Sequence, residues 1–135
     1  MNVRPQKLKP KAFTLVELLI VIAIIGLLAT LSVIALQSAR AKARDAKRVA
    51  DIRQISTALE MFLNDYGRYP TDLEWATGSL TSPDGTDTYL AVIPSAPTPA
   101  DGSCDGTTNA FSYAQTDGGA SYTLSFCLGG GIGNL

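Results

Sequence analysis

Apolar residues dominate one continuous stretch near the start of the chain, and polar residues interrupt the pattern almost everywhere after it. The segment from Leu18 to Leu36 contains 19 residues and no charge. As an α-helix rising about 1.5 Å per residue, it would be roughly 28 Å long, close to the roughly 30 Å hydrocarbon core of a bilayer. We therefore expect the chain to enter a membrane through this segment.

Beyond Leu36 the apolar positions keep a helical spacing but occupy only one face. Apolar residues recur three, four or seven positions apart at Val49, Ile52, Ile55, Leu59, Phe62 and Tyr66. This spacing is typical of a helix that packs one side on a globular body. The two patterns together predict a long helix from Phe13 to Tyr66, ended by Gly67, whose amphipathic part spans 37–67.

The remaining residues, 68–135, carry β-strand patterns between turn residues. We expect strands at 88–93, 109–116 and 120–127, with Asp117-Gly118-Gly119 joining the last two as a hairpin. One face of this hairpin would pack on the apolar stripe of the helix through Phe111, Tyr113, Tyr122, Leu124 and Phe126. The expected fold class is α+β, with a long N-terminal helix packed on a small antiparallel sheet.

Charge is divided along the chain. Ten of the eleven basic residues lie at or before Arg53, whereas seven acids and no bases lie from Tyr69 onward. The basic stretch SARAKARDAKR has no aromatic residue to stack on a nucleotide, and Asp45 and Asp51 lie within one helical turn of its bases. We therefore expect a solvated face beside the membrane, able to touch anionic lipid headgroups, and no nucleic-acid site.

The first twelve residues carry four bases, Arg4, Lys7, Lys9 and Lys11, as the leader of an export signal does. An ordinary secretory signal would have a shorter apolar stretch and a small-x-small cleavage site, and Ala39-Arg40-Ala41 has that form. The apolar stretch is too long for such a signal, so we expect no cleavage there. Bases flank both ends of the apolar segment, so charge counting leaves its orientation open.

The motif AFTLVE at 12–17, behind a basic leader and in front of the apolar segment, resembles the type III signal of type IV prepilins and type II secretion pseudopilins. The resemblance covers Lys11 to about Pro70. It implies that a membrane-embedded prepilin peptidase cuts between Ala12 and Phe13 on the cytoplasmic side and N-methylates Phe13. Two positions depart from the family, because Ala12 replaces the usual glycine and Ile34 replaces a common helix-kinking proline.

The resemblance also implies a role for Glu17, the single carboxylate at the start of the membrane segment. An unpaired carboxylate in a membrane costs about 2.5–3.5 kcal/mol or more. In an assembling filament, the Phe13 amine of an incoming subunit can pair with Glu17 of a neighbour. The alternative is that Glu17 lies at the membrane edge and snorkels to the headgroups. Within the helix, Gly26 and Thr30 either allow close helix packing or are simply residues common in membrane helices.

The two cysteines, Cys104 and Cys127, lie in the half that we expect to be exported. An isolated pair in that compartment most often forms a disulfide, and this pair resembles the disulfide-bounded C-terminal loop of type IV pilins. Secretion pseudopilins more often have a calcium site in this region. We expect no metal or other cofactor, because the candidate calcium ligands do not follow EF-hand spacing: Asp84, Asp87, Asp101 and Asp105.

An enzyme is not expected, because the chain has no histidine and neither cysteine has an evident activating partner. The resemblance and the cysteine pair favour a structural subunit of a type IV pilus, with identical or related pilin subunits and an inner-membrane assembly platform as partners. The alternatives are a type II secretion or DNA-uptake pseudopilin, and a monomeric membrane-anchored or secreted binding module.

The expected organisation is a cytoplasmic leader that is cleaved (1–12), a transmembrane and assembly helix (13–36), an amphipathic helix (37–67) and an extracytoplasmic head (68–135). The chain would first be a single-pass prepilin in the cytoplasmic membrane and then part of an extracellular or periplasmic filament.

Overall fold

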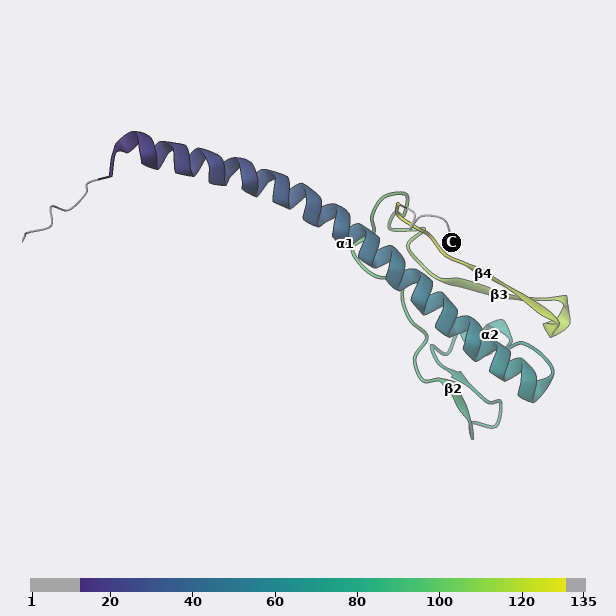
Figure 1. Cartoon of the computed structure of the whole chain (residues 1–135). Coiled ribbons are helices and arrows are strands. Elements are labelled where there is room, and N and C mark those ends of the chain that lie inside the picture. The colour runs from purple at the N-terminus through teal and green to yellow at the C-terminus, as the bar shows by residue number, and fades with distance from the viewer. Residues whose placement is uncertain (1–12, 131–135) are drawn as a thin grey trace, which may run out of the picture. The chain divides into compact units, whose positions relative to one another are not determined.

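The computed structural model describes residues 13–130, so the leader and Ala12 lie outside the described residues. Along the chain the elements are α1 (Leu15–Tyr66), α2 (Asp72–Trp75), β1 (Leu80–Thr81), β2 (Thr88–Leu90), β3 (Ser112–Thr116), the 3₁₀ turn η1 (Asp117–Gly119) and β4 (Ser121–Ser125) (Figure 1). The chain divides into two compact units between Gln37 and Ser38. One long N-terminal helix and small antiparallel sheets confirm the expected α+β class.

Local residues set both ends of α1. Thr14 precedes the helix, and its hydroxyl accepts a backbone N–H of the first turn at 3.2 Å. At the other end, Gly67 has a φ of +64° and donates its N–H to the carbonyl of Leu63 at 2.8 Å. This left-handed glycine satisfies one of the last helical carbonyls. The helix therefore ends where the sequence predicted and begins slightly later, at Leu15.

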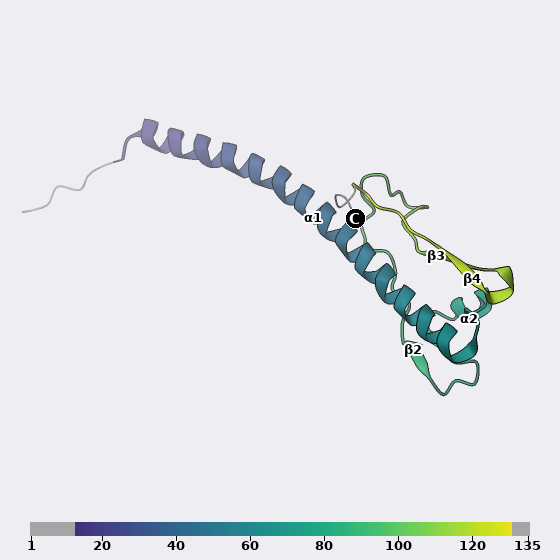
Figure 2. The same ribbon diagram turned by 45° about the vertical axis from the view of Figure 1, so that its right-hand side comes forward.

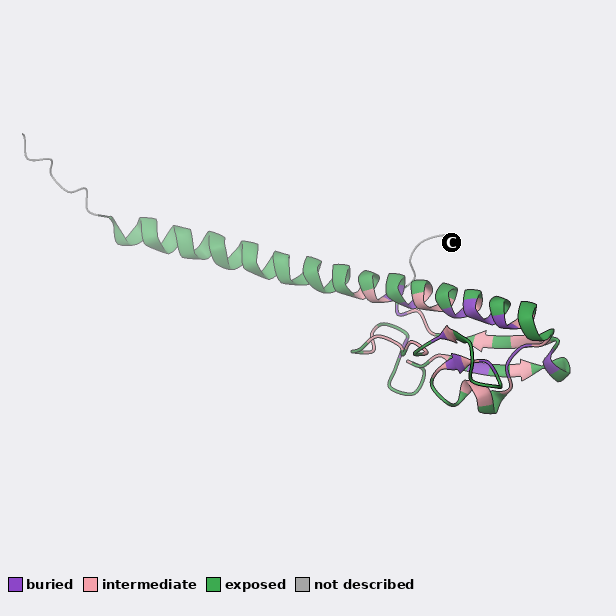
Figure 3. Ribbon diagram, turned by 90° about the horizontal axis from the view of Figure 1, so that it is seen from below, coloured by how far each residue is buried: buried purple, intermediate pink, exposed green. Residues whose placement is uncertain are grey.

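The core of the second unit lies on one face of α1. Ile55, Leu59 and Phe62 are fully buried there, and Figure 3 shows the buried residues along a single side of the helix. The head covers that side with Tyr69, Leu80, Leu90 and Tyr113. The predicted stripe is thus confirmed, although its last member, Tyr66 at the end of α1, is 37% exposed, with its ring packed on Phe62 and Tyr89.

The hairpin expected from the sequence is β3 and β4, joined by η1 (Figure 2). Tyr113 lies opposite Leu124, and Gln115 lies opposite Tyr122. The register therefore places the predicted aromatic residues on one face, since alternate residues of a strand point to the same side. The strands are shorter than the expected 109–116 and 120–127.

The buried face of the hairpin is centred on Tyr113. Its ring stacks on Trp75 with the centroids 4.6 Å apart, and its hydroxyl donates to the carbonyl of Pro70 at 2.6 Å. Phe126 was expected on the same face but is 38% exposed, because β4 ends at Ser125.

A second sheet and a short helix complete the head. The predicted strand at 88–93 is β2, limited to 88–90, and it pairs with β1, which was not predicted. The helix α2 lies in the expected loop around Pro70. Thr71 and Glu74 cap it reciprocally, and a hydrogen-bonded Arg68 lowers the pKa of Glu74 to about 2 despite partial burial.

Candidate functional site

The start of α1 holds Glu17 in a hydrogen-bonded turn with Thr14. The backbone N–H and the hydroxyl of Thr14 donate to Oε2 of Glu17 at 2.9 and 2.8 Å, and the Glu17 N–H donates back to that hydroxyl. This reciprocal pattern is a capping box, which stabilises the first turn of a helix. Among residues 13–130, nothing donates to Oε1 of Glu17, so this oxygen is open to a donor from another molecule.

The part of α1 in the first unit is exposed on every side. No residue from Phe13 to Gln37 is buried, and an 18-residue window there has a mean hydropathy of 3.0. Thr30 and Ser32 donate their hydroxyls to carbonyls of the same helix at 2.8 Å, so these donors are satisfied internally. The helix has the length and composition to cross a membrane, as the sequence predicted.

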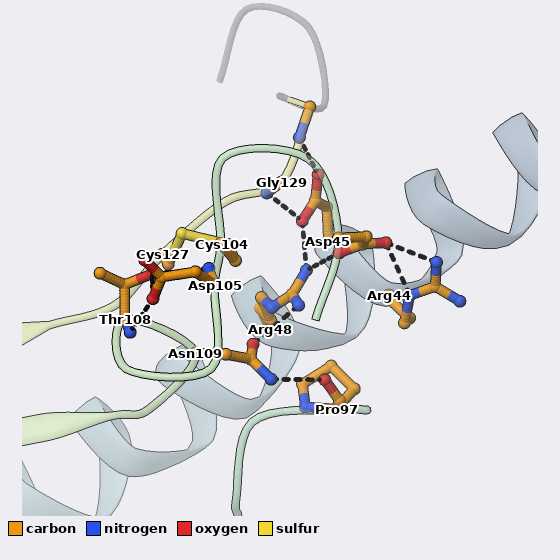
Figure 4. Close-up of polar contacts among 12 residues, drawn as sticks. Arg44, Asp45, Arg48, Pro97, Cys104, Asp105, Thr108, Asn109, Cys127 and Gly129 are labelled. Carbon is orange, nitrogen blue, oxygen red and sulfur yellow. Dashed lines mark hydrogen bonds and ion pairs between the residues drawn. A yellow bond between two sulfur atoms is a disulfide. The ribbon is translucent and has the colours of Figure 1, made fainter. Parts of the chain in front are cut away.

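In the second unit, a buried arginine joins α1 to the loops of the head (Figure 4). The Arg48 side chain is fully buried and donates to Asp45 at 2.6 Å, to Asp101 at 3.1 Å and to Asn109 at 2.8 Å. Arg44 also pairs with Asp101 at 2.6 Å. A buried charge is tolerated only when it is paired and hydrogen-bonded, and in these five residues, the Arg48 cluster, both terminal nitrogens of Arg48 have acceptors, while its buried Nε has none among the described residues.

Within the cluster, the Asp45 carboxylate binds the backbone of the C-terminal segment. The N–H groups of Gly129 and Gly130 donate to the two carboxylate oxygens at 2.8 and 2.9 Å. Burial acts to raise the pKa of Asp45, but these two donors and Arg48 together hold the pKa below its usual value. The ionised carboxylate therefore connects α1 to the end of the described chain.

This cluster corrects the expectation of a uniformly solvated basic face. Asp45 and Arg48 are 1% and 0% exposed. A sequence signal for this burial existed, because Arg48 lies four and seven positions before Ile52 and Ile55 and so continues the apolar stripe. Their charges concealed it. Of the bases in this stretch, only Arg40, Lys42 and Lys47 are exposed, because Arg44 is half-buried and paired with Asp101.

The Cys104–Cys127 disulfide is confirmed, with the Cα atoms 5.6 Å apart. Cys104 lies between Asp101 and Asn109 in sequence, and Cys127 lies two residues before Gly129, so the disulfide joins the same two segments that reach the Arg48 cluster (Figure 4). Closing a loop of sequence separation 23 contributes about 3 kcal/mol on a chain-entropy estimate. The covalent and the ionic links thus support each other.

The four candidate calcium ligands do not form one site. Asp101 is held by the two arginines of the Arg48 cluster. Asp84 and Asp105 accept hydrogen bonds from hydroxyls and N–H groups of their own loops, and Asp87 lies in the same turn as Asp84. Over the described range 13–130, no three acids, cysteines or histidines are arranged to hold a metal ion.

Gly102 lies where the 101–109 loop passes closest to the C-terminal segment. Its φ is +58°, and a Cβ there would overlap the carbonyl oxygen of Gly129. We expect Gly102→Ala to lower the free energy of unfolding by about 1–3 kcal/mol or more, because the two backbones must separate. Gly106→Ala is the matched control in the same loop, since its Cβ would meet no atom within 4 Å. Denaturant titration measures both, and equal stabilities would contradict the close contact.

Comparison with known families places the N-terminal region in a recognised class. Residues 7–33 match the family model described as the prokaryotic N-terminal methylation motif. The match includes the second half of the leader, the Ala12-Phe13 junction and most of the apolar segment of α1.

Curated relatives extend the similarity beyond that motif. The type II secretion system core protein G of Aeromonas hydrophila is 44% identical over 66 residues, covering 49% of this chain and 46% of that protein. The protein of the same name from Escherichia coli K12 is 44% identical over 63 residues, covering 47% and 43%. The one from Pseudomonas aeruginosa is 30% identical over 97 residues, covering 66% and 68%. The chain spans about half the length of most of the curated relatives that it matches, and no solved structure matches it significantly.

Proposed function

The chain belongs to the family of type IV prepilins and type II secretion pseudopilins, and on this premise we propose that it is a structural subunit of a type II secretion pseudopilus. The observation that carries the proposal is the similarity of the chain to core protein G. The match to the Pseudomonas aeruginosa relative covers 97 residues and therefore continues beyond the end of α1. The cysteine pair had favoured a type IV pilus. A disulfide stabilises any small exported head, however, so it does not separate the two classes.

We propose that prepilin peptidase removes residues 1–12 and methylates the new amine of Phe13. Two features support this step. Phe13, which would follow the cut, lies outside α1, because the helix begins at Leu15. The residues after it form a capped apolar helix that can stay in the membrane during cleavage.

Assembly would then use the exposed apolar helix. Such a surface needs lipid or other helices around it, and in a filament the helices of other subunits replace the lipid. Apart from the local backbone of α1, no atom of the described residues lies within 4 Å of the position that a Cβ of Gly26 would occupy, so a neighbouring helix could approach closely there. Glu17 would accept a hydrogen bond from the Phe13 amine of the incoming subunit through its open Oε1.

The remaining proposed partner is the inner-membrane assembly platform, and the filament would extend into the periplasm.

The proposal is tested by deleting the gene in its source bacterium and restoring it on a plasmid. We expect folded exoproteins to accumulate in the periplasm of the deletion strain and to reach the medium again after complementation. N-terminal mass spectrometry of the restored protein should find a chain beginning at methylated Phe13.

Other outcomes would support the alternatives. Loss of surface fibres with normal secretion would favour a type IV pilus, and loss of transformation alone would favour a DNA-uptake pseudopilus. A mature chain beginning at Lys42 would show cleavage after Ala39-Arg40-Ala41 and replace the filament proposal with a secreted binding module.

A further inference from the structure

Outside its ion pairs, the second unit carries its remaining bases on α1, where the acids Asp51, Glu60 and Asp65 also lie. Among the described residues, every salt bridge is made by Arg44, Arg48 or Arg68. The other bases within 13–130 are exposed and lie on one stretch of α1, which we call the basic collar: Arg40, Lys42, Lys47 and Arg53.

The head has the opposite charge. No base follows Arg68 in the sequence, and Arg68 itself pairs with Glu74 at 2.8 Å. The exposed acids of the head make no ion pair within the part of the chain that the structure describes: Asp72, Asp84, Asp87, Asp105 and Asp117. Their hydrogen bonds come from neutral groups, such as the Ser82 hydroxyl to Asp84, which leave the charge in place.

Lipid headgroups alone do not account for the basic collar. The headgroup layer adds roughly 5–8 Å to each side of the hydrocarbon core. Lys47 and Arg53 follow Leu36 by eleven and seventeen residues, which corresponds to roughly 16 and 25 Å of helix. Headgroups can therefore reach the first two members of the collar, whereas Lys47 and Arg53 lie beyond the headgroup layer and are free to contact another protein surface.

We propose that the basic collar of one copy docks against the acidic head loops of a neighbouring copy in the filament. This inference rests on the proposed function and concerns how the same subunits are oriented. Collar and head are different surfaces that both stay exposed in every copy, so the contact is head-to-tail and can repeat along a filament. Complementary charges steer the encounter and suppress wrong registers, while the apolar helix supplies non-directional attraction.

Carbodiimide cross-linking tests the contact directly, because this reagent joins a lysine amine to a carboxylate that it touches. After Phe13 the chain has only two lysines, Lys42 and Lys47, and both belong to the collar. The mature full-length chain is reconstituted in neutral phosphatidylcholine vesicles as an equal mixture of ¹⁴N- and ¹⁵N-labelled protein. We expect mixed-isotope peptides that join Lys47 or Lys42 to acids of the head. Cross-links confined to peptides of a single isotope would overturn the proposal.

Charge reversal provides a second test. The double variant Lys47→Glu, Arg53→Glu should lower the yield of sedimentable oligomer roughly tenfold, because attraction becomes like-charge repulsion. Both positions are exposed, so the fold should survive, and circular dichroism checks this. The matched control Lys47→Arg, Arg53→Lys exchanges the side chains and keeps both charges, and it should assemble as the wild type does.

The outcomes separate this inference from the proposed function. Normal oligomers from the charge-reversed chain would overturn the docking contact and leave the filament proposal standing. A loss of oligomer seen only in vesicles containing phosphatidylglycerol would also overturn it, in favour of a lipid contact. Failure of the wild-type chain to assemble or cross-link in either kind of vesicle would overturn the docking contact, whereas the filament proposal stands or falls by the secretion test of the deletion strain.

Discussion

Replacing Arg48 with methionine should lower the free energy of unfolding by about 3–5 kcal/mol, as expected when one partner of a buried ion pair is removed. Methionine is similar in length but cannot donate, so the carboxylates of Asp45 and Asp101 would be left close together without their shared cation. The measurement is a denaturant titration of the full chain in detergent. The fluorescence of Trp75, the single tryptophan, reports on the head because its ring stacks on Tyr113.

Two controls make this result specific to the cluster. Lys47→Met removes a neighbouring but exposed charge from the same helix and should change stability by no more than about 0.5 kcal/mol. Arg48→Lys keeps the charge but not the planar fork that reaches Asp45, Asp101 and Asn109 together, so its stability should fall between those of wild type and Arg48→Met. An Arg48→Met protein as stable as wild type would show that the cluster adds nothing to the fold.

Replacing Glu17 with glutamine should leave membrane insertion and cleavage intact while filaments become sparse or absent. Glutamine can take the place of glutamate in a capping box, so the first turn of α1 keeps its cap and only the negative charge is lost. Without that charge, the incoming amine of Phe13 has no anion to pair with. The measurement is the filament yield in a sheared fraction, normalised to the amount of cleaved protein.

The control for this change is Thr14→Ala, which removes the hydroxyl that caps the helix but keeps the Glu17 carboxylate. If Glu17 acts only as a helix cap, Thr14→Ala should reduce filaments at least as much as Glu17→Gln does. If its charge pairs with a neighbour, Thr14→Ala should assemble better. Wild-type filament levels from cleaved Glu17→Gln protein would reject the assembly role.

The sequence predicted the elements in which apolar residues recur at a regular spacing over many positions. The long helix followed from an uncharged segment joined to a three- and four-residue stripe, and the hairpin followed from alternation around Asp117-Gly118-Gly119. By contrast, β1 has two residues and α2 has four, which is too short for any period to show. The capping residues Thr71 and Glu74 were a readable signal for α2, as were Thr14 and Glu17 for the start of α1.

The Arg48 cluster could not be assembled from the sequence in the same way. Apart from the local Arg48–Asp45 pair, its contacts join residues 53 to 85 positions apart, and nothing near Asp101 or Gly129 indicates which part of the helix they approach. Only Arg48 had a sequence signal, its place on the apolar stripe, and its charge led to the prediction of a solvated face instead. The disulfide was predictable because its two cysteines are the only pair available.

The long sequence separation of the Arg48 cluster also determines when it can form. Asp45 and Gly129 are 84 residues apart, and contacts between such distant residues form after local helices and hairpins because loop closure is slower. During synthesis, Gly129 leaves the ribosome long after Asp45. We therefore expect a folding intermediate with α1 and the β3–β4 hairpin formed but the 101–109 loop still loose. A protease present at that stage would cut this loop first, and the native head would resist the same cut.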